Sequence, residues 1–221
     1  MLFSFDRNVF LSQIHAQFGN IPQSAADGLN FILGCIEQDI TNWENLNQVA
    51  YGFATFKRET GDAFQPIHER GPVSYFGKYD PGTQLGAQLG NTAAGDGFLF
   101  RGRGYVQITG RKNYTYIGGQ LKVDLVASPD HALQPDVAYK IASSGMKQGW
   151  FTAHRLSQYI PTGGAPDYFH ARRIINGLDH ADEIAANAQK FQSILEMALK
   201  PQPDATTASA TSVPATTTPT P

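Results

Sequence analysis

The sequence predicts a mainly helical domain followed by a disordered tail. Over most of residues 1–200 the apolar residues recur at helical spacing, and no alternation of strands and helices suggests a parallel sheet. From residue 201 the composition changes to Thr and Pro with almost nothing to bury, which is typical of disordered segments. We therefore expect one domain over residues 1–200 and a disordered tail over residues 201–221.

Two helices are expected at the start of the chain. Asp6 is a suitable N-cap for the first helix, which Gly19 should close, and Ser24 precedes the second. The apolar positions of the first are Val9, Phe10, Ile14 and Phe18, and those of the second are Leu29, Ile32, Leu33 and Ile36.

Three further helices are expected later in the chain. Thr41 and Glu44 have the spacing of a capping box, which should open a third helix that ends near Gly61. Gln134-Pro135 is a suitable start for another helix, and Asp179 or His180 for the last one. Their apolar positions are Trp43, Leu46, Val49, Ala50, Phe53 and Ala54, then Val137, Ile141 and Met146, then Ile184, Phe191, Ile194, Leu195 and Ala198.

The middle of the chain should be irregular. Residues 61–104 contain Gly and Pro too often for long helices, so we expect loops with short strands. The run YVQIT, residues 105–109, alternates apolar and polar side chains as a short strand does.

Composition excludes several classes of function. The net charge of −2 and the pI near 6.3 argue against a nucleic-acid-binding protein, which is usually strongly basic. The single cysteine, Cys35, permits neither an internal disulfide nor a cysteine metal cluster, and the six histidines have no metal-ligand spacing. No run of apolar residues is long enough to span a bilayer, and the N-terminus does not read as a signal peptide. We expect no cofactor, no metal and no membrane insertion.

Two carboxylates are candidates for acid–base chemistry. Glu59, in ATFKRETG, falls at the end of the third expected helix, and Glu69, in FQPIHERG, lies ten residues further on. Hydrolysis of a glycosidic bond with inversion needs a protonated carboxyl and an ionised carboxyl about 6.5–9.5 Å apart. From spacing alone, a solvated charge at a helix end is the commoner explanation of Glu59, and Glu69 beside Arg70 is equally ordinary.

The segment FLFRGRGYVQITGRKNY, residues 98–114, combines four cations, three glycines and four aromatic residues. An RNA-binding RG segment is a poor interpretation because the paired unit RGRG does not recur beyond this stretch. A phosphate-binding loop is poorer, since no GK[ST] follows the glycines. Two interpretations of the segment remain open: a solvated basic face and the floor of an active site.

These stretches together resemble glycoside hydrolase family 19, the plant-chitinase-like family, and most of all its branch of phage endolysins and bacterial cell-wall hydrolases. GNTAAGDGFLFRGRGYVQITGRKNY, residues 90–114, resembles the family's GRG-x-x-Q-[IL]-[ST]-G-x-x-N-Y block, and ATFKRETG resembles the helix end that carries its general acid. FQPIHERG resembles the segment of the second carboxylate, and LQPDVAYKIASSGMKQGWF and ARRIINGLDH resemble two later motifs. The resemblance extends over about residues 45–195.

The resemblance implies a lysozyme-like fold, with two helical lobes around a cleft and a small β element near residues 98–109. It implies that Glu59 is the general acid and that Glu69 is the general base. Thr109 would hold the attacking water. The residues expected to bind sugar are Tyr105, Gln107, Asn113 and Asn176. Arg58 replaces the family's usual His beside the acid.

The expected function is cleavage of β-1,4 bonds between N-acetylated amino sugars by an endolysin-type enzyme acting on peptidoglycan. The alternatives are a chitinase, a lytic transglycosylase and a non-catalytic wall-binding module. A nucleic-acid binder is a distant alternative. We expect a monomer that is synthesised in the cytoplasm and acts on the cell wall after it is released. If the protein comes from a phage, we expect release through a holin.

Overall fold

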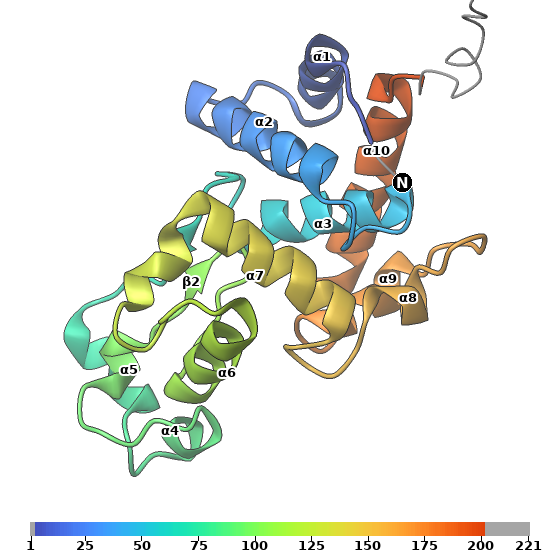
Figure 1. Cartoon of the computed structure of the whole chain (residues 1–221). Coiled ribbons are helices and arrows are strands. Elements are labelled where there is room, and N and C mark those ends of the chain that lie inside the picture. The colour runs from blue at the N-terminus through green and yellow to red at the C-terminus, as the bar shows by residue number, and fades with distance from the viewer. Residues whose placement is uncertain (1–2, 202–221) are drawn as a thin grey trace, which may run out of the picture.

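Helices dominate the computed structural model, which describes residues 3–201 (Figure 1). The prediction of a mainly helical chain is confirmed. The tail expected over residues 201–221 lies, apart from residue 201, outside the described residues. The α-helices are α1 (Arg7–Phe18), α2 (Gln23–Gln38), α3 (Leu46–Glu59), α4 (Gln84–Gln88), α5 (Asp96–Leu99), α6 (Arg111–Leu121), α7 (Pro135–Gln148), α8 (Leu156–Tyr159), α9 (Tyr168–Ala171) and α10 (Ala181–Ala198). The 3-10 helices are η1 (Val73–Tyr79), η2 (Pro129–Leu133) and η3 (Arg172–Ile174), and the strands are β1 (Ile67–His68) and β2 (Arg103–Gly104).

The helices form two groups. Helices α4, α5 and α6 gather at one end of the molecule, and α1, α2 and α10 at the other, with α3 and α7 between them (Figure 1). The N-terminal segment is joined to the end of α10, because the backbone N–H of Asp6 donates to the carbonyl of Ala198 at 2.8 Å. Within the described residues, no helix is both long and apolar enough to cross a membrane.

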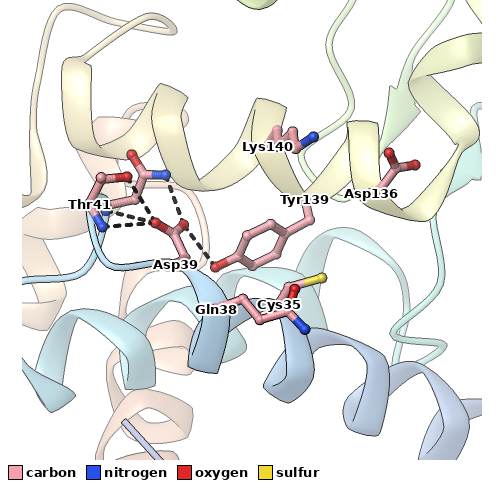
Figure 2. Close-up of a pocket in the computed structure, with 8 residues that line it drawn as sticks. Cys35, Gln38, Asp39, Thr41, Asp136, Tyr139 and Lys140 are labelled. Atoms are coloured by element: carbon pink, nitrogen blue, oxygen red, sulfur yellow. Dashed lines mark hydrogen bonds between the residues drawn. The ribbon is translucent and has the colours of Figure 1, made fainter. Parts of the chain in front are cut away.

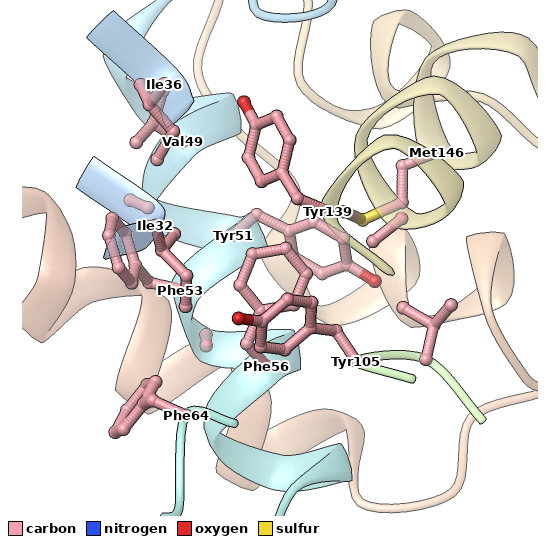
Figure 3. Close-up of a cluster of buried hydrophobic side chains, with 14 of the residues drawn as sticks. Ile32, Ile36, Val49, Tyr51, Phe53, Phe56, Phe64, Tyr105, Tyr139 and Met146 are labelled. Carbon is pink, nitrogen blue, oxygen red and sulfur yellow. The ribbon is translucent and has the colours of Figure 1, made fainter. Parts of the chain in front are cut away.

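Helix α3 forms the centre of the core. Residues 48–56 are all buried, so this helix is enclosed on every side rather than along one stripe. It packs against α10, and the aromatic side chains around it are shown in Figure 3. Trp43 lies over Gly52, where a Cβ would come within 2.7 Å of the indole, and the Trp43 Nε1 donates to the Tyr139 hydroxyl on α7 at 2.7 Å. The rigid α3 therefore fixes the position of its last residue, Glu59.

Most expected helix boundaries agree with the structure, and two do not. Ser24 does not precede the second helix but lies inside it, since α2 begins at Gln23 with Pro22 as its N-cap. The Asp6 carboxylate caps α1, α7 begins at Pro135, and His180 precedes α10. The capping box at Thr41 is wrong: α3 begins at Leu46, and its N-cap is Asn45, whose side chain accepts from the Gln48 N–H. The Thr41 hydroxyl instead donates to Asp39, because the chain turns there before the helix starts.

The β element is smaller than expected. Strands β1 and β2 pair antiparallel, and residues 105–109 do not form the predicted strand. The chain turns back on itself there, with one isolated bridge between Arg103 and Ile108, while Gly104 and Gln107 have φ of +88° and +53°. These left-handed conformations interrupt the alternation of side chains that a strand would give.

Candidate active site

A polar hollow of about 350 Å³ lies where α6, the turn at residues 106–109 and the segment after η3 meet. Four of the residues expected to act on the substrate line it: Gln107, Thr109, Asn113 and Asn176. We call it the polar hollow. The structure therefore brings together residues that are up to about 70 positions apart in the sequence.

Gly102 is the point on which three candidate residues converge. A Cβ built on Gly102 would lie 2.8 Å from Gln107 Oε1, 3.4 Å from Glu69 Cβ and 3.4 Å from Thr109 Oγ1. The buried glycine thus leaves just enough room for these side chains to meet over the backbone. Glu69 therefore lies beside two residues of the polar hollow.

Glu69 is held by both its backbone and its side chain. Its N–H donates to the Gly102 carbonyl at 2.8 Å, and the Gly102 N–H donates to Glu69 Oε2 at 3.3 Å. The Tyr79 hydroxyl, at the end of η1, donates to Glu69 Oε1 at 3.1 Å. Burial raises the pKa of Tyr79, so the hydroxyl keeps its proton and remains a donor at neutral pH. Each oxygen of Glu69 thus has one donor that fixes its direction.

The polar residues of the turn are held by backbone carbonyls. Gln107 Nε2 donates to the carbonyls of Ile67 and Gly104, both at 2.9 Å, which leaves Oε1 as its available acceptor. The Thr109 hydroxyl donates to the Gln107 carbonyl at 3.0 Å, so its lone pairs can still accept a hydrogen bond. Asn113 Nδ2 donates to the Thr109 carbonyl at 2.8 Å. The set is preorganised before any ligand binds.

Glu59 is paired with an arginine from a distant segment. The Arg172 Nη1 donates to Glu59 Oε1 at 2.6 Å, and the two side chains are 4% and 17% exposed. The Arg172 carbonyl also accepts from the N–H of Asn176, a residue that lines the polar hollow. Arg172 therefore connects the carboxyl of Glu59 with Asn176, a residue that lines the polar hollow.

Arg58, the cation next to Glu59 in sequence, points elsewhere. Its Nη1 lies 3.6 Å from Glu183 Oε2 on α10. The neighbour in the sequence is thus not the neighbour in space, and the cation beside Glu59 is Arg172.

The expectation that Tyr105 binds sugar is wrong. Tyr105 is fully buried, with its ring centroid 5.0 Å from that of Phe56 in the core (Figure 3). Because Gly104 and Gln107 have left-handed conformations, Tyr105 does not share a face with Gln107 and Thr109.

Sequence reasoning missed two residues that hold the candidate carboxylates. Tyr79 lies in the aromatic run VSYFGKY, and Arg172 lies in the ARRIINGL motif. Neither stretch carries a sequence signal that predicts the contact with a glutamate. Two of the four cations of the 98–114 segment hold loops through ion pairs, so the segment does not form a continuous basic face. Arg103 pairs with Asp130 at 2.8 Å, and Arg111 pairs with Asp96 at 2.6 Å.

Another hollow, of about 430 Å³, lies between the end of α2 and α7 (Figure 2). Asp39 is already saturated there, since its carboxylate accepts from Thr41, Asn42 and the Tyr139 hydroxyl. Burial raises the pKa of the Cys35 thiol to about 11, so this cysteine is not a thiolate nucleophile at neutral pH. Over residues 3–201, no three or more His, Cys, Asp or Glu side chains are arranged to hold a metal ion.

Comparisons with protein-family models and with curated proteins find no match, whereas solved structures match over most of the chain. Chitinase C from Streptomyces griseus HUT6037 matches with a TM-score of 0.59 at 20% identity, over 86% of this chain and 78% of that one. A mutant of chitinase C matches with the same values. A bacterial family 19 chitinase matches with a TM-score of 0.52 at 16% identity, over 86% of this chain and 94% of that one. The chain has the fold of a family 19 chitinase. The lysozyme-like fold implied by the resemblance is thereby confirmed. At sequence identities of 16–20%, the similarity establishes the fold alone.

Proposed function

We propose that the protein is a glycoside hydrolase that cleaves β-1,4 bonds between N-acetylated amino sugars with inversion. The convergence of Glu69, Gln107 and Thr109 over Gly102 carries this proposal, because it places a held carboxylate beside a hydroxyl and an amide at the polar hollow. Glu59 supplies a second carboxyl, which Arg172 connects with Asn176 of the polar hollow. Two carboxyls on opposite sides of the bound bond are what inversion requires.

Glu59 acts as the general acid. Arg172 donates to Oε1, so Oε2 is the oxygen that carries the proton to the glycosidic oxygen as the C1–O bond breaks. The carboxyl becomes a carboxylate during this step, 2.6 Å from the guanidinium nitrogen. Arg172 therefore stabilises charge that develops in the transition state, in a site where both side chains are shielded from water.

Glu69 acts as the general base toward a water on the other face of the sugar ring. It takes one proton as the water oxygen bonds to C1, so that Glu59 ends ionised and Glu69 ends protonated. The Thr109 hydroxyl, with its hydrogen on the Gln107 carbonyl, accepts the second hydrogen of that water. The catalytic cycle closes when solvent returns a proton to Glu59 and removes one from Glu69.

Sugar binding falls to the amides of the polar hollow. Gln107 Oε1 accepts from the N–H of an acetamido group, since its Nε2 is committed to backbone carbonyls. Asn113 and Asn176 face the same volume from α6 and from the segment after η3. These groups select N-acetylated sugars because an unpaired polar group would be costly in the closed complex.

We assign peptidoglycan as the substrate and an endolysin-type role in wall degradation, on the strength of the sequence resemblance to that branch. Chitin is the second candidate, because the solved structures with this fold are chitinases. A catalytic module of residues 1–200 acting as a monomer, made in the cytoplasm and reaching the wall after release, is part of the same proposal.

Mass spectrometry of digested cell wall and of digested chitin oligomers tests this function. Hydrolysis adds one water to each pair of fragments and leaves a reducing end, whereas a transglycosylase leaves an anhydro sugar. Reducing-end fragments from wild type support the proposal. Anhydro products, or intact glycans together with tight wall binding, would overturn it in favour of a transglycosylase or a binding module.

A further inference from the structure

A second hollow adjoins the polar hollow and is about twice its size. It encloses about 690 Å³, and its lining includes Arg111, Lys112, Asn113, Tyr116, Trp150 and Phe151. We call it the aromatic hollow. Asn113 and Phe151 line both hollows, so a chain of sugars bound in the first continues directly into the second.

Lys112 gives the aromatic hollow its charge. Arg111 also lines it but forms two hydrogen bonds to Asp96, at 2.6 and 2.8 Å. Arg111 lowers the pKa of Asp96 to about 2, so this pair stays ionised and mutually neutral at working pH. The Lys112 side chain forms no hydrogen bond or ion pair within residues 3–201, and no carboxylate lines the aromatic hollow. The lining therefore presents one uncompensated positive charge.

The backbone of Lys112 is fixed in place. Its N–H donates to the Leu89 carbonyl at 3.1 Å, and Gly90 lies against it with φ +66°. A Cβ on Gly90 would come within 2.7 Å of Lys112 Cβ. Lys112 is thus a solvent-exposed cation whose side chain extends from a fixed backbone position in the lining of the hollow.

Aromatic side chains supply an apolar surface in the same hollow as this charge. Tyr116 and Trp150 meet edge to face, with centroids 6.5 Å apart, and Tyr116 is 47% exposed. The apolar face of a pyranose ring gains by covering such exposed aromatic surface. The hollow thus combines a surface for a sugar ring with a cation for a substituent.

We propose that the aromatic hollow binds a sugar that carries a carboxylate, as on the lactyl ether or the attached peptide of a peptidoglycan strand. Lys112 recognises the carboxylate and Trp150 contacts the ring. This inference rests on the proposed function and narrows its substrate: neutral chitin fills the hollow but leaves Lys112 without a partner.

Trp150 provides the readout that tests the proposal. In the Glu59→Gln variant, which keeps the glycan intact during titration, tryptophan fluorescence is followed on adding a carboxylate-bearing wall disaccharide or neutral chitobiose. We expect the wall disaccharide to bind about fivefold more tightly at low salt, with the preference lost at high salt. A Trp150→Phe variant should remove most of the signal, because the other tryptophan, Trp43, is buried in the core.

The charge of Lys112 is tested by matched variants. Lys112→Gln should abolish the preference for the wall disaccharide and Lys112→Arg should retain it. Lys140→Gln, which removes an exposed lysine lining a different hollow, should also retain it. Equal affinity for both disaccharides in the parent, or a preference that survives in Lys112→Gln, would overturn the inference.

The binding test does not depend on turnover. A protein that discriminates through Lys112 but releases no reducing ends refutes the proposed hydrolysis and leaves the recognition in place. A protein that hydrolyses both glycans without discriminating between the disaccharides refutes the recognition and leaves the hydrolysis in place.

Discussion

Replacing Gly102 with alanine tests whether the convergence over this residue organises the site. The new methyl group would lie 2.8 Å from Gln107 Oε1, closer than atoms can approach, so the Gln107 side chain must move. Its two hydrogen bonds to Ile67 and Gly104 are then lost, at about 1 kcal/mol each. For a domain of this size, about 2 kcal/mol corresponds to a fall in Tm of about 4–8 °C.

The same change should affect activity far more than stability. Glu69 Cβ and Thr109 Oγ1 lie 3.4 Å from the new methyl group, an ordinary van der Waals contact, so the substitution disturbs them through the displaced Gln107 side chain. Misplacing catalytic groups by about 1 Å costs about 100-fold in rate. We expect kcat/KM on soluble oligosaccharides to fall by about that factor, measured beside a thermal melt.

Gly119→Ala is the matched control. Gly119 lies within α6, nothing is within 4 Å of its added Cβ, and the change should stabilise the helix by about 1 kcal/mol without altering turnover. Gly102→Ala with wild-type Tm and wild-type kcat/KM would refute the reasoning about the site.

Three further predictions follow from the contacts of the site and from the composition of the tail. Tyr79→Phe removes one hydrogen bond to the Glu69 carboxylate, which contributes about 1.5 kcal/mol. The change should lower kcat about tenfold with little change in KM. An unchanged kcat would show that Tyr79 does not position Glu69. Thr109→Val and Glu69→Gln should each cost at least about 100-fold in kcat, and their double variant should be far less than additive because both act on one water. Near-normal cleavage rates in both single variants would instead favour a transglycosylase. Deleting residues 202–221 should leave the Tm and the hydrolysis rate unchanged, because the segment has almost nothing to bury; a drop of several degrees in a calorimetric melt would contradict this.

Local signals in the sequence predicted five of the ten α-helices of the described residues. Asp6, Pro135 and His180 act through neighbours within one turn, so their effect can be read from the chain. Helix α6 was not predicted, since the two adjacent glycines at 118 and 119 lower its helix propensity and its packing stabilises it instead. The strand at residues 105–109 was wrong because the left-handed conformation of Gln107 depends on bonds to Ile67 and Gly104.

The candidate site, too, contains residues that the sequence could predict and residues that it could not. Its carboxylates and amides were proposed from the resemblance to family motifs, which follow one another in order along the chain. The residues that hold them were not, because Arg172 meets Glu59 across 113 positions and Tyr79 meets Glu69 through a short irregular segment. Tyr105 was placed wrongly because the alternation of residues 105–109 predicted a strand. The chain turns there instead, and Tyr105 is buried in the core.

The stereochemistry of cleavage tests the central claim most directly. Proton NMR of the sugar released at the first moments of digestion distinguishes the α from the β anomer before mutarotation mixes them. Attack of water on the opposite face of a β-linked sugar predicts the α anomer from wild type and no released sugar from Glu59→Gln, whose amide cannot donate the catalytic proton. Release of the β anomer, or turnover by a folded Glu59→Gln variant within tenfold of wild type, would contradict the two-carboxylate inverting mechanism.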